Sequence, residues 1–305
     1  MFRHTTNQRL LTIALSALVL AGCPSEQNPG SPSESPGEFD LVGFVDNPDL
    51  DEISGIETAV RGDFYVHNDE GKPLFHVLNQ QGRYQSSIEL KGAQNRDWED
   101  ITIVTDAGQR WLVAGDIGDN QARHKTIRLY FAREPVADEA GNYPADVELE
   151  HRIKLKFPDG PRDCEAMAWD SASRQILFMT KRDKVPRLYG LPLETALSEK
   201  SAELVFLTEV PTFSPPTAIE KLSSGKRALW LSQPTGMDIS DDGLLATVIT
   251  YRSLYVFERQ PGETWAEAFQ NKPREFHGPP GIYEEAVTVD EMKTRIHVVG
   301  EKVPT

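Results

Sequence analysis

Apolar residues in this chain come in short runs and rarely at the three-to-four-residue spacing of an amphipathic helix. Runs of three to six residues, each bounded by charged residues or glycine, occupy positions 64–66, 111–114, 176–179, 244–249 and 296–299. Runs of this length are typical of buried β-strands. The 22 glycines and 21 prolines among 305 residues also favour many turns over long helices. The pattern predicts an all-β fold.

A repeated phrase precedes each of these runs by about ten residues. It consists of a polar residue, a small or acidic residue and an aliphatic one. The five copies are Ser54-Gly55-Ile56, Glu99-Asp100-Ile101, Glu165-Ala166-Met167, Thr235-Gly236-Met237 and Glu285-Ala286-Val287. Four short strands recurring with such a phrase are typical of the blade of a β-propeller. We therefore expect five four-stranded blades, with six as the alternative because residues 211–234 are either a long loop or the remains of a sixth blade.

The two ends of the repeat array predict how the ring closes. The last copy of the repeat contains only two strands, whereas residues 39–45 precede the first phrase at the place of a fourth strand. The outer strand of the last blade is therefore expected to come from the N-terminal side. This closure would protect the edges of the sheets.

The N-terminal segment has the features of a secretory signal. Arg9 precedes an apolar run from Leu10 to Leu20, too short at about 1.5 Å per residue to span a bilayer of about 30 Å. The run continues Ala21-Gly22-Cys23, which resembles the bacterial lipobox and implies acylation of Cys23. Residues 24–38 contain no large apolar side chain and indicate a disordered tether. We expect a signal peptide at 1–22, a lipidated tether at 23–38 and a propeller at 39–305; the alternative is an ordinary signal peptide with an incidental cysteine.

Charge and sorting signals define the expected surroundings. The formal net charge of −15 argues against a nucleic-acid partner, which requires a clustered basic surface. An acidic domain is repelled by anionic lipid, so acyl chains on Cys23 are expected to hold the protein to the membrane. Pro24 stands where aspartate would signal inner-membrane retention, so by resemblance to Gram-negative lipoprotein sorting we expect an outer-membrane lipoprotein that faces the periplasm.

The repeated phrase also predicts a cluster of carboxylates. The first strand of each propeller blade lines the central channel, so Ser54, Glu99, Glu165, Thr235 and Glu285 are expected around one channel mouth, with Asp100, Asp163 and Glu284 next to them. Such oxygens suit Ca²⁺ or another hard divalent cation, and like charges raise one another's pKa unless a cation lies among them. Lys181, Arg182 and Arg252 are candidate basic partners and ligand-binding residues. The alternative is structural: each glutamate accepts backbone N–H bonds from the neighbouring blade.

A second candidate is the segment Gly115–Asn120, where aspartate, asparagine and glycine are concentrated. Asp116, Asp119 and Asn120 could face a cation or a polar ligand, or they could form a tight turn with bonds to their own backbone. The distal glutamate of an EF-hand is absent. The sequence also has no paired-histidine zinc motif, no Gly-x-Ser-x-Gly and no phosphate-binding loop, so no nucleotide cofactor is expected.

Four phrases resemble a family of secreted bacterial propeller proteins grouped as phytase-like or esterase-like. They are Asp97-Trp98-Glu99-Asp100-Ile101, Gly115-Asp116-Ile117-Gly118-Asp119-Asn120, Asp163-Cys164-Glu165-Ala166-Met167 and Tyr283-Glu284-Glu285-Ala286-Val287. Related lactonase propellers hold one divalent cation with a glutamate at a blade start and with asparagine or aspartate from other blades. The resemblance implies Glu99, Asp116, Glu165 and Glu285 as candidate metal ligands. The multi-calcium phosphate site of true phytases has no counterpart in this sequence.

Two functions remain open from the sequence. The first is an envelope lipoprotein whose propeller binds a small-molecule ligand or an envelope protein. The second is a divalent-metal-dependent hydrolase of a phosphoester, ester or lactone, with Glu165 and Glu285 as the candidate catalytic residues.

Overall fold

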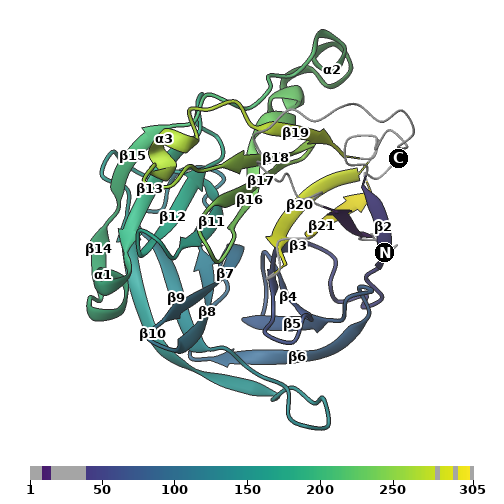
Figure 1. Cartoon of the computed structure of the whole chain (residues 1–305), viewed down its shortest axis with the longest axis vertical. Helices are drawn as coiled ribbons and strands as arrows, with labels where there is room; N and C mark the ends of the chain where they lie inside the picture. The colour runs from purple at the N-terminus through teal and green to yellow at the C-terminus, as the bar shows by residue number, and fades with distance from the viewer. Residues whose placement is uncertain (1–8, 15–38, 279–281, 291–294, 303–305) are drawn as a thin grey trace, which may run out of the picture.

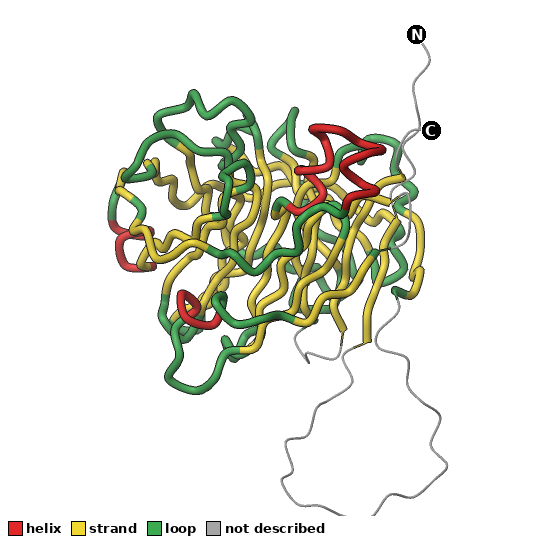
Figure 2. Tube along the Cα trace, turned by 90° about the horizontal axis from the view of Figure 1, so that it is seen from above, coloured by secondary structure: helices red, strands yellow, loops and turns green. Residues whose placement is uncertain are grey.

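The computed structural model describes residues 9–14, 39–278, 282–290 and 295–302. Its strands radiate around a central axis and follow one another round the ring in chain order (Figure 1). Strands fill the middle of the molecule, and the helices are short and peripheral (Figure 2). The expected all-β propeller is confirmed by this arrangement.

The described strands form five groups of four, which we number in chain order. Group 1 contains β3 (Ile53–Thr58), β4 (Phe64–Asn68), β5 (Leu74–Leu78) and β6 (Tyr84–Lys91). Group 2 contains β7 (Trp98–Asp106), β8 (Gln109–Asp116), β9 (Ile127–Arg133) and β10 (Asp146–Lys156). Group 3 contains β11 (Cys164–Asp170), β12 (Gln175–Thr180), β13 (Arg187–Pro192) and β15 (Val205–Glu209), and β14 (Ser201–Glu203) pairs with β10 of group 2.

Group 4 contains β16 (Pro234–Ile239), β17 (Leu245–Thr250), β18 (Ser253–Glu258) and β19 (Arg274–His277). Group 5 contains β20 (Ile282–Val289), β21 (Arg295–Lys302), β1 (Arg9–Ala14) and β2 (Asp40–Phe44). The helical segments are α1 (Leu193–Ser198), α2 (Ala218–Ser224), the 3₁₀-helix η1 (Gly225–Ser232) and α3 (Trp265–Ala268).

Two features bear on the number of blades. A short parallel pairing of β6 with β10 joins groups 1 and 2 into one nine-stranded sheet. Strand pairing alone therefore does not separate these two groups, and the count of five blades is an interpretation. Residues 211–233 contain α2 and η1 and, in the described structure, no strand. This segment is therefore an insertion between β15 and β16.

The ring closes with strands from the N-terminal side. β2 is the outermost strand of group 5, as expected for residues 39–45. The position between β2 and β21 is filled by β1, whose residues the sequence assigns to the apolar core of a signal peptide. The boundary after residue 22 stays a prediction, and Cys23 lies outside the described residues. Among the described helices, none is both long and apolar enough to cross a bilayer.

The repeated phrase corresponds to a repeated β-bulge. In all five groups the register between the first and second strands shifts at the first residue of the phrase. A bulge places one extra residue in a strand, bends that strand and redirects the side chain. The bulged residues are Ser54, Glu99, Glu165, Thr235 and Glu285.

Buried carboxylates join the groups near the axis. Asp100 accepts backbone N–H bonds from Ile101 (2.9 Å), from Met167 of β11 (2.8 Å) and from Met237 of β16 (3.2 Å). Glu57 accepts from Ile103 of β7 at 2.9 Å. Because an unpaired buried N–H is costly, these contacts fix one group against the next. Asp100 and Glu57 thus make inter-blade backbone bonds of the kind that the sequence allows for the phrase glutamates.

Candidate functional site

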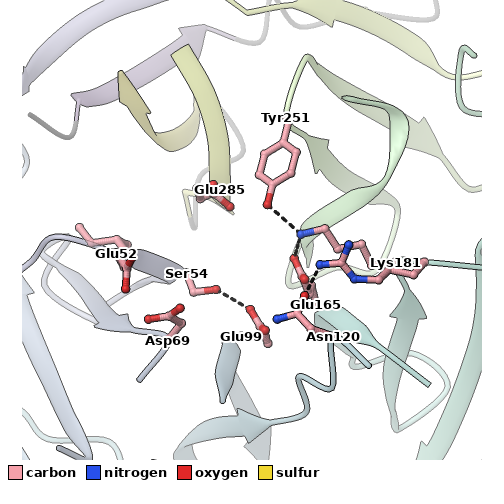
Figure 3. A pocket seen from close by; sticks show the side chains of 11 residues that line it. Glu52, Ser54, Asp69, Glu99, Asn120, Glu165, Lys181, Tyr251 and Glu285 are labelled. Atoms are coloured by element: carbon pink, nitrogen blue, oxygen red, sulfur yellow. Dashed lines mark hydrogen bonds and ion pairs between the residues drawn. The ribbon is translucent and has the colours of Figure 1, made fainter. Parts of the chain in front are cut away.

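A cavity of about 170 Å³ opens at one mouth of the central channel. Four of the five bulged residues line it: Ser54, Glu99, Glu165 and Glu285. The remaining residues come from the start of β3 and from the segments that follow the second strands, and they are Glu52, Ile53, Asp69, Asn120, Lys181, Arg182 and Tyr251. Glu99, Glu165 and Glu285 lie on different sides of the same space, and Tyr251 points toward Lys181 (Figure 3). The bulges therefore bring polar side chains from four groups to one place.

Three carboxylates form the tightest part of this site. One oxygen each of Glu99, Asp163 and Glu165 lies within 4.8 Å of the others, and all three residues are buried. Ser54 Oγ donates a hydrogen bond to Glu99 Oε2 at 2.9 Å. The backbone N–H of Asp119 donates to Asp163 Oδ1 at 3.0 Å. The cluster is thus held in position by a hydroxyl and by a backbone amide.

The carboxylates perturb one another's protonation. Burial, followed by the charges of Glu165 and Asp97, holds the pKa of Glu99 well above its ordinary value of 4.5. Burial raises the pKa of Glu165 to about 7, although the Lys181 ammonium acts in the opposite direction. At the cavity wall, burial and Glu52 raise the pKa of Asp69 to about 7. Near neutral pH, Glu165 and Asp69 therefore stand close to the midpoint of their titration.

Lys181 and Arg182 supply the positive charge of the cavity. Lys181 is buried and forms an ion pair with Glu165, and its ammonium also donates to Tyr251 Oη at 2.9 Å and lies 4.5 Å from the centre of that ring. Burial alone would lower the pKa of Lys181, but Glu165 and neighbouring groups outweigh it, so the pKa is raised. Arg182 Nε lies 2.6 Å from Asp163 Oδ2, and its guanidinium also donates to Asn120.

Asp116 and Asp119, two residues of the predicted Asp/Asn/Gly cluster, are engaged elsewhere. Asp116 is fully buried, pairs with Arg128 at 2.9 Å and accepts the backbone N–H of Asp97 at 3.1 Å. Asp119 accepts the backbone N–H of His124 at 2.6 Å, which closes its own loop. The structure does not bring the Asp116 carboxylate to the cavity. It does bring Asn120 there, and the backbone of this loop positions Asp163.

Arg252 also lies beside the cavity and not on its lining. Its guanidinium pairs with Glu220 of α2 at 2.9 Å and donates to the backbone oxygen of Ser214 at 2.7 Å. Its neighbour Tyr251 is the residue that reaches the cavity. Arg252 therefore attaches the insertion of residues 211–233 to the channel mouth.

Sequence reasoning named Asp163 only as a neighbour and missed Tyr251 and Gly118. A signal for Asp163 was present, because Asp97 and Asp163 both stand two residues before a phrase glutamate. A Cβ atom at Gly118 would lie 2.3 Å from Glu99 Oε1 and 2.5 Å from Asp97 Cγ. The absence of a side chain at position 118 therefore lets these carboxyl groups approach the loop closely.

The donor set fits a hard divalent cation. Three carboxylates from two groups offer oxygen ligands in one buried cluster, and Ca²⁺ favours such ligands. Ion pairs with Lys181 and Arg182 compensate two of the three charges. The nearby acids Asp69, Asp97 and Glu52 add to the negative charge, so a cation would relieve the repulsion that, after burial, raises the pKa of Glu99 and Asp69.

This strand topology and polar channel mouth define the chain as a β-propeller with an acidic central site. It matches no protein-family model and no curated protein. Among solved structures it is similar to the Dos1 propeller, with 11% identity and a TM-score of 0.38 over 86% of this chain and 71% of the other. Hydrazine synthase from Kuenenia stuttgartiensis has 9% identity and a TM-score of 0.39 over 84% and 62% of the two chains. The PQQ-bound aldose sugar dehydrogenase of Streptomyces coelicolor has 10% identity and a TM-score of 0.43 over 83% and 95%.

Proposed function

We propose that this chain is an envelope lipoprotein whose propeller binds a small polar ligand at the channel mouth, together with Ca²⁺ or another divalent cation. The buried cluster of Glu99, Asp163 and Glu165 is the observation that carries the proposal. A cation bound among these close carboxylates would stabilise the folded chain, because it offsets their mutual repulsion at short range. When bound there, the cation would supply a positive charge that polarises an oxygen of the ligand.

The residues around the cluster would orient its carboxylates and donate hydrogen bonds to the ligand. Ser54 and the backbone N–H of Asp119 orient the two carboxylates that they contact. Lys181 and Arg182 offer N–H donors on one side of the cavity to an anionic or hydroxylated ligand. A cavity of about 170 Å³ suits a compact ligand or one end of a longer chain.

A second candidate is hydrolysis of a phosphoester, ester or lactone, favoured by the protonation behaviour of Glu165. A general base works best when its pKa is close to the working pH, and burial raises that of Glu165 to about 7. In such a reaction Glu165 would take a proton from the attacking water, while Lys181, whose ammonium also donates to Tyr251 Oη, keeps its carboxylate in place. Glu285 lines the same cavity from group 5 and is the second carboxylate to test.

Thermal unfolding with and without added cation tests the first proposal. Ca²⁺ or Mn²⁺ is expected to raise the Tm of the wild-type chain, and Glu99→Gln is expected to remove most of that increase. The matched control is Glu139→Gln, which changes an exposed loop residue away from the cavity. Equal increases in Tm for the wild type, Glu99→Gln and the control would refute cation binding at this cluster.

Activity and binding screens separate the two candidates. A hydrolase predicts turnover of simple phosphoester, ester or lactone substrates that depends on the cation and is lost in Glu165→Gln. A binding protein predicts no turnover, and Tm shifts with particular polar compounds that Glu99→Gln reduces. Isolation of an envelope protein in a stable complex with the wild type would favour a macromolecular partner for the propeller.

Fractionation tests the lipoprotein assignment. The wild-type chain is expected in the outer membrane fraction with a mass that includes acyl chains on Cys23. Cys23→Ser is expected to lose that mass and to be released from the membrane fraction by a high-salt wash that leaves the wild type in place. Identical masses and fractions for the two chains would reject lipidation and favour an ordinary signal peptide.

A further inference from the structure

The insertion between β15 and β16 exposes an unusual concentration of apolar side chains. Ile219 and Leu222 of α2 are 79% and 89% exposed, and Leu229 and Trp230 of η1 are 58% and 43% exposed. Twelve large hydrophobic residues are exposed in the described structure, and four of them fall within residues 219–230. Isolated exposed apolar residues are normal in soluble proteins, whereas a cluster of them marks an interaction site. We call Ile219, Leu222, Leu229 and Trp230 the apolar tip.

The same segment is locally basic in a strongly acidic chain. Lys221, Lys226 and Arg227 are exposed and make no ion pair with the described carboxylates. The acidic residue of the segment, Glu220, is already paired with Arg252. The apolar tip therefore stands among three available positive charges, although the whole chain carries −15.

Specific contacts fix this segment beside the channel mouth. Thr217 and Glu220 form a capping box at the start of α2, and Glu220 pairs with Arg252 at 2.9 Å. The Trp230 ring lies 5.8 Å from the guanidinium of Arg182, which lines the cavity. Ser232 Oγ donates to the backbone oxygen of Ser214 at 2.7 Å. The segment is thus attached at its base while α2 projects outward from the ring (Figure 1).

We propose that α2 and η1 insert into the surface of an anionic lipid bilayer and hold the propeller at the membrane by the segment that lies beside the channel mouth. Apolar side chains with lysine and arginine beside them match the two parts of a bilayer interface, since the apolar groups enter the acyl boundary and the cations meet the headgroups. Tryptophan has the mixed character that such an interface favours. A small projecting tip also differs from a stable protein interface, which covers about 800 Å² on each partner.

This proposal differs from the expectation from overall charge. The sequence predicts repulsion between an acidic domain and anionic lipid, but the fold gathers three basic residues on one projection beside the cavity. The contact is also independent of acylation, because it uses a different part of the chain from Cys23.

The test uses the full chain with Cys23→Ser, so that no acyl chain contributes to binding. Co-sedimentation with vesicles of phosphatidylcholine alone and of phosphatidylcholine with phosphatidylglycerol measures the partition coefficient. Binding is expected with phosphatidylglycerol and should weaken with salt, because screening reduces attraction between exposed charges. Adding Leu222→Glu should lower the partition coefficient about tenfold or more, since one buried leucine contributes about that factor. Adding Leu244→Glu, at an exposed leucine in the turn before β17, should leave it unchanged.

Spectroscopy locates the contact and separates the remaining outcomes. Brominated lipid is expected to quench tryptophan fluorescence, and Trp230→Phe should remove most of the quenching. Equal partition of the Leu222→Glu and parent chains would show that another segment binds lipid and would overturn the proposal. Absence of binding to phosphatidylglycerol vesicles would overturn it as well. Light scattering that shows a dimer abolished by Leu222→Glu, without vesicle binding, would assign the tip to contact between two copies of the chain.

Discussion

Replacing Glu165 with glutamine should stabilise the folded chain at alkaline pH, even though it removes one member of a buried ion pair. Glu165 is buried beside Glu99 and Asp163, and the Lys181 ammonium offsets only part of the cost of burying its charge. Its pKa accordingly rises from an ordinary 4.5 to about 7. A carboxyl whose pKa is raised by folding contributes stability below the unfolded value, and this stability is lost as the pH rises through the folded value.

The magnitude follows from that difference in pKa. A rise from 4.5 to about 7 corresponds to about 3 kcal/mol, at about 1.36 kcal/mol for each pH unit. Glutamine has nearly the same shape as the neutral acid and does not ionise. The two proteins should therefore have similar free energies of unfolding near pH 4.5, and the variant should be about 3 kcal/mol more stable at about pH 8.5.

Urea denaturation across this pH range measures the difference. Glu139→Gln serves as the control and should change the free energy of unfolding by less than about 0.5 kcal/mol at any pH. Excess Ca²⁺ should remove most of the difference in stability between the two proteins at alkaline pH. It should stabilise the wild type alone, by about 2.7 kcal/mol at a hundredfold excess over Kd. If Glu165→Gln destabilises the chain equally at both ends of the range, the ion pair with Lys181 outweighs burial and the reasoning is wrong.

Two further substitutions test the structure around this site. Asp100→Ala should lower the free energy of unfolding by about 3 kcal/mol or more, because three buried backbone N–H groups lose their acceptor at about 1–3 kcal/mol each. Urea denaturation, with Glu139→Gln as the control, measures this loss. Gly118→Ala should reduce or abolish the increase in Tm with Ca²⁺, since the new methyl group would stand 2.3 Å from Glu99 Oε1. The circular dichroism spectrum should stay that of the folded chain. An unchanged increase in Tm with Ca²⁺ would exclude a ligand role for Glu99 in its present position.

The apolar runs identified most of the second strands because buried strands keep both faces away from water. The run at 64–66 lies in β4 and the run at 176–179 lies in β12. The repeated phrase predicted four of the positions that line the cavity, because each phrase carries the same bulge, whereas Thr235 is not among the lining residues. Repetition therefore located the channel mouth without any long-range information.

Spacing did not predict which way a side chain points at the end of a strand. Asp116 and Asp119 stand in one dense cluster, yet Asp116 turns into group 2 toward Arg128, and Asp163 from another group completes the carboxylate cluster. A change of one residue in register moves a side chain to the opposite face. Tyr251 was missed because nothing in its local sequence indicates that its side chain reaches a cavity.

The insertion was visible in the sequence as a gap, but its helix was not recognised. Thr217 and Glu220 have the three-residue spacing of a capping box, which would have identified the start of α2. The apolar residues of α2 are exposed, so no buried stripe marks this helix. The capping-box spacing and the apolar residues of α2 both lie within a few positions of one another in the sequence.

β1 couples the proposed processing of the chain to its fold. An apolar run of this length fits a signal core and a buried strand equally well, and in the structure Arg9–Ala14 pairs with β21 over six residues and with β2. Cleavage before Cys23 would remove β1 and leave the backbone of β21 without this partner. Leu11→Pro, which removes one backbone donor from β1, should therefore lower the Tm of the unprocessed Cys23→Ser chain and leave the Tm of the mature lipoprotein unchanged. An equal Tm for the unprocessed chain with and without the proline would mean that β1 does not complete the blade in solution.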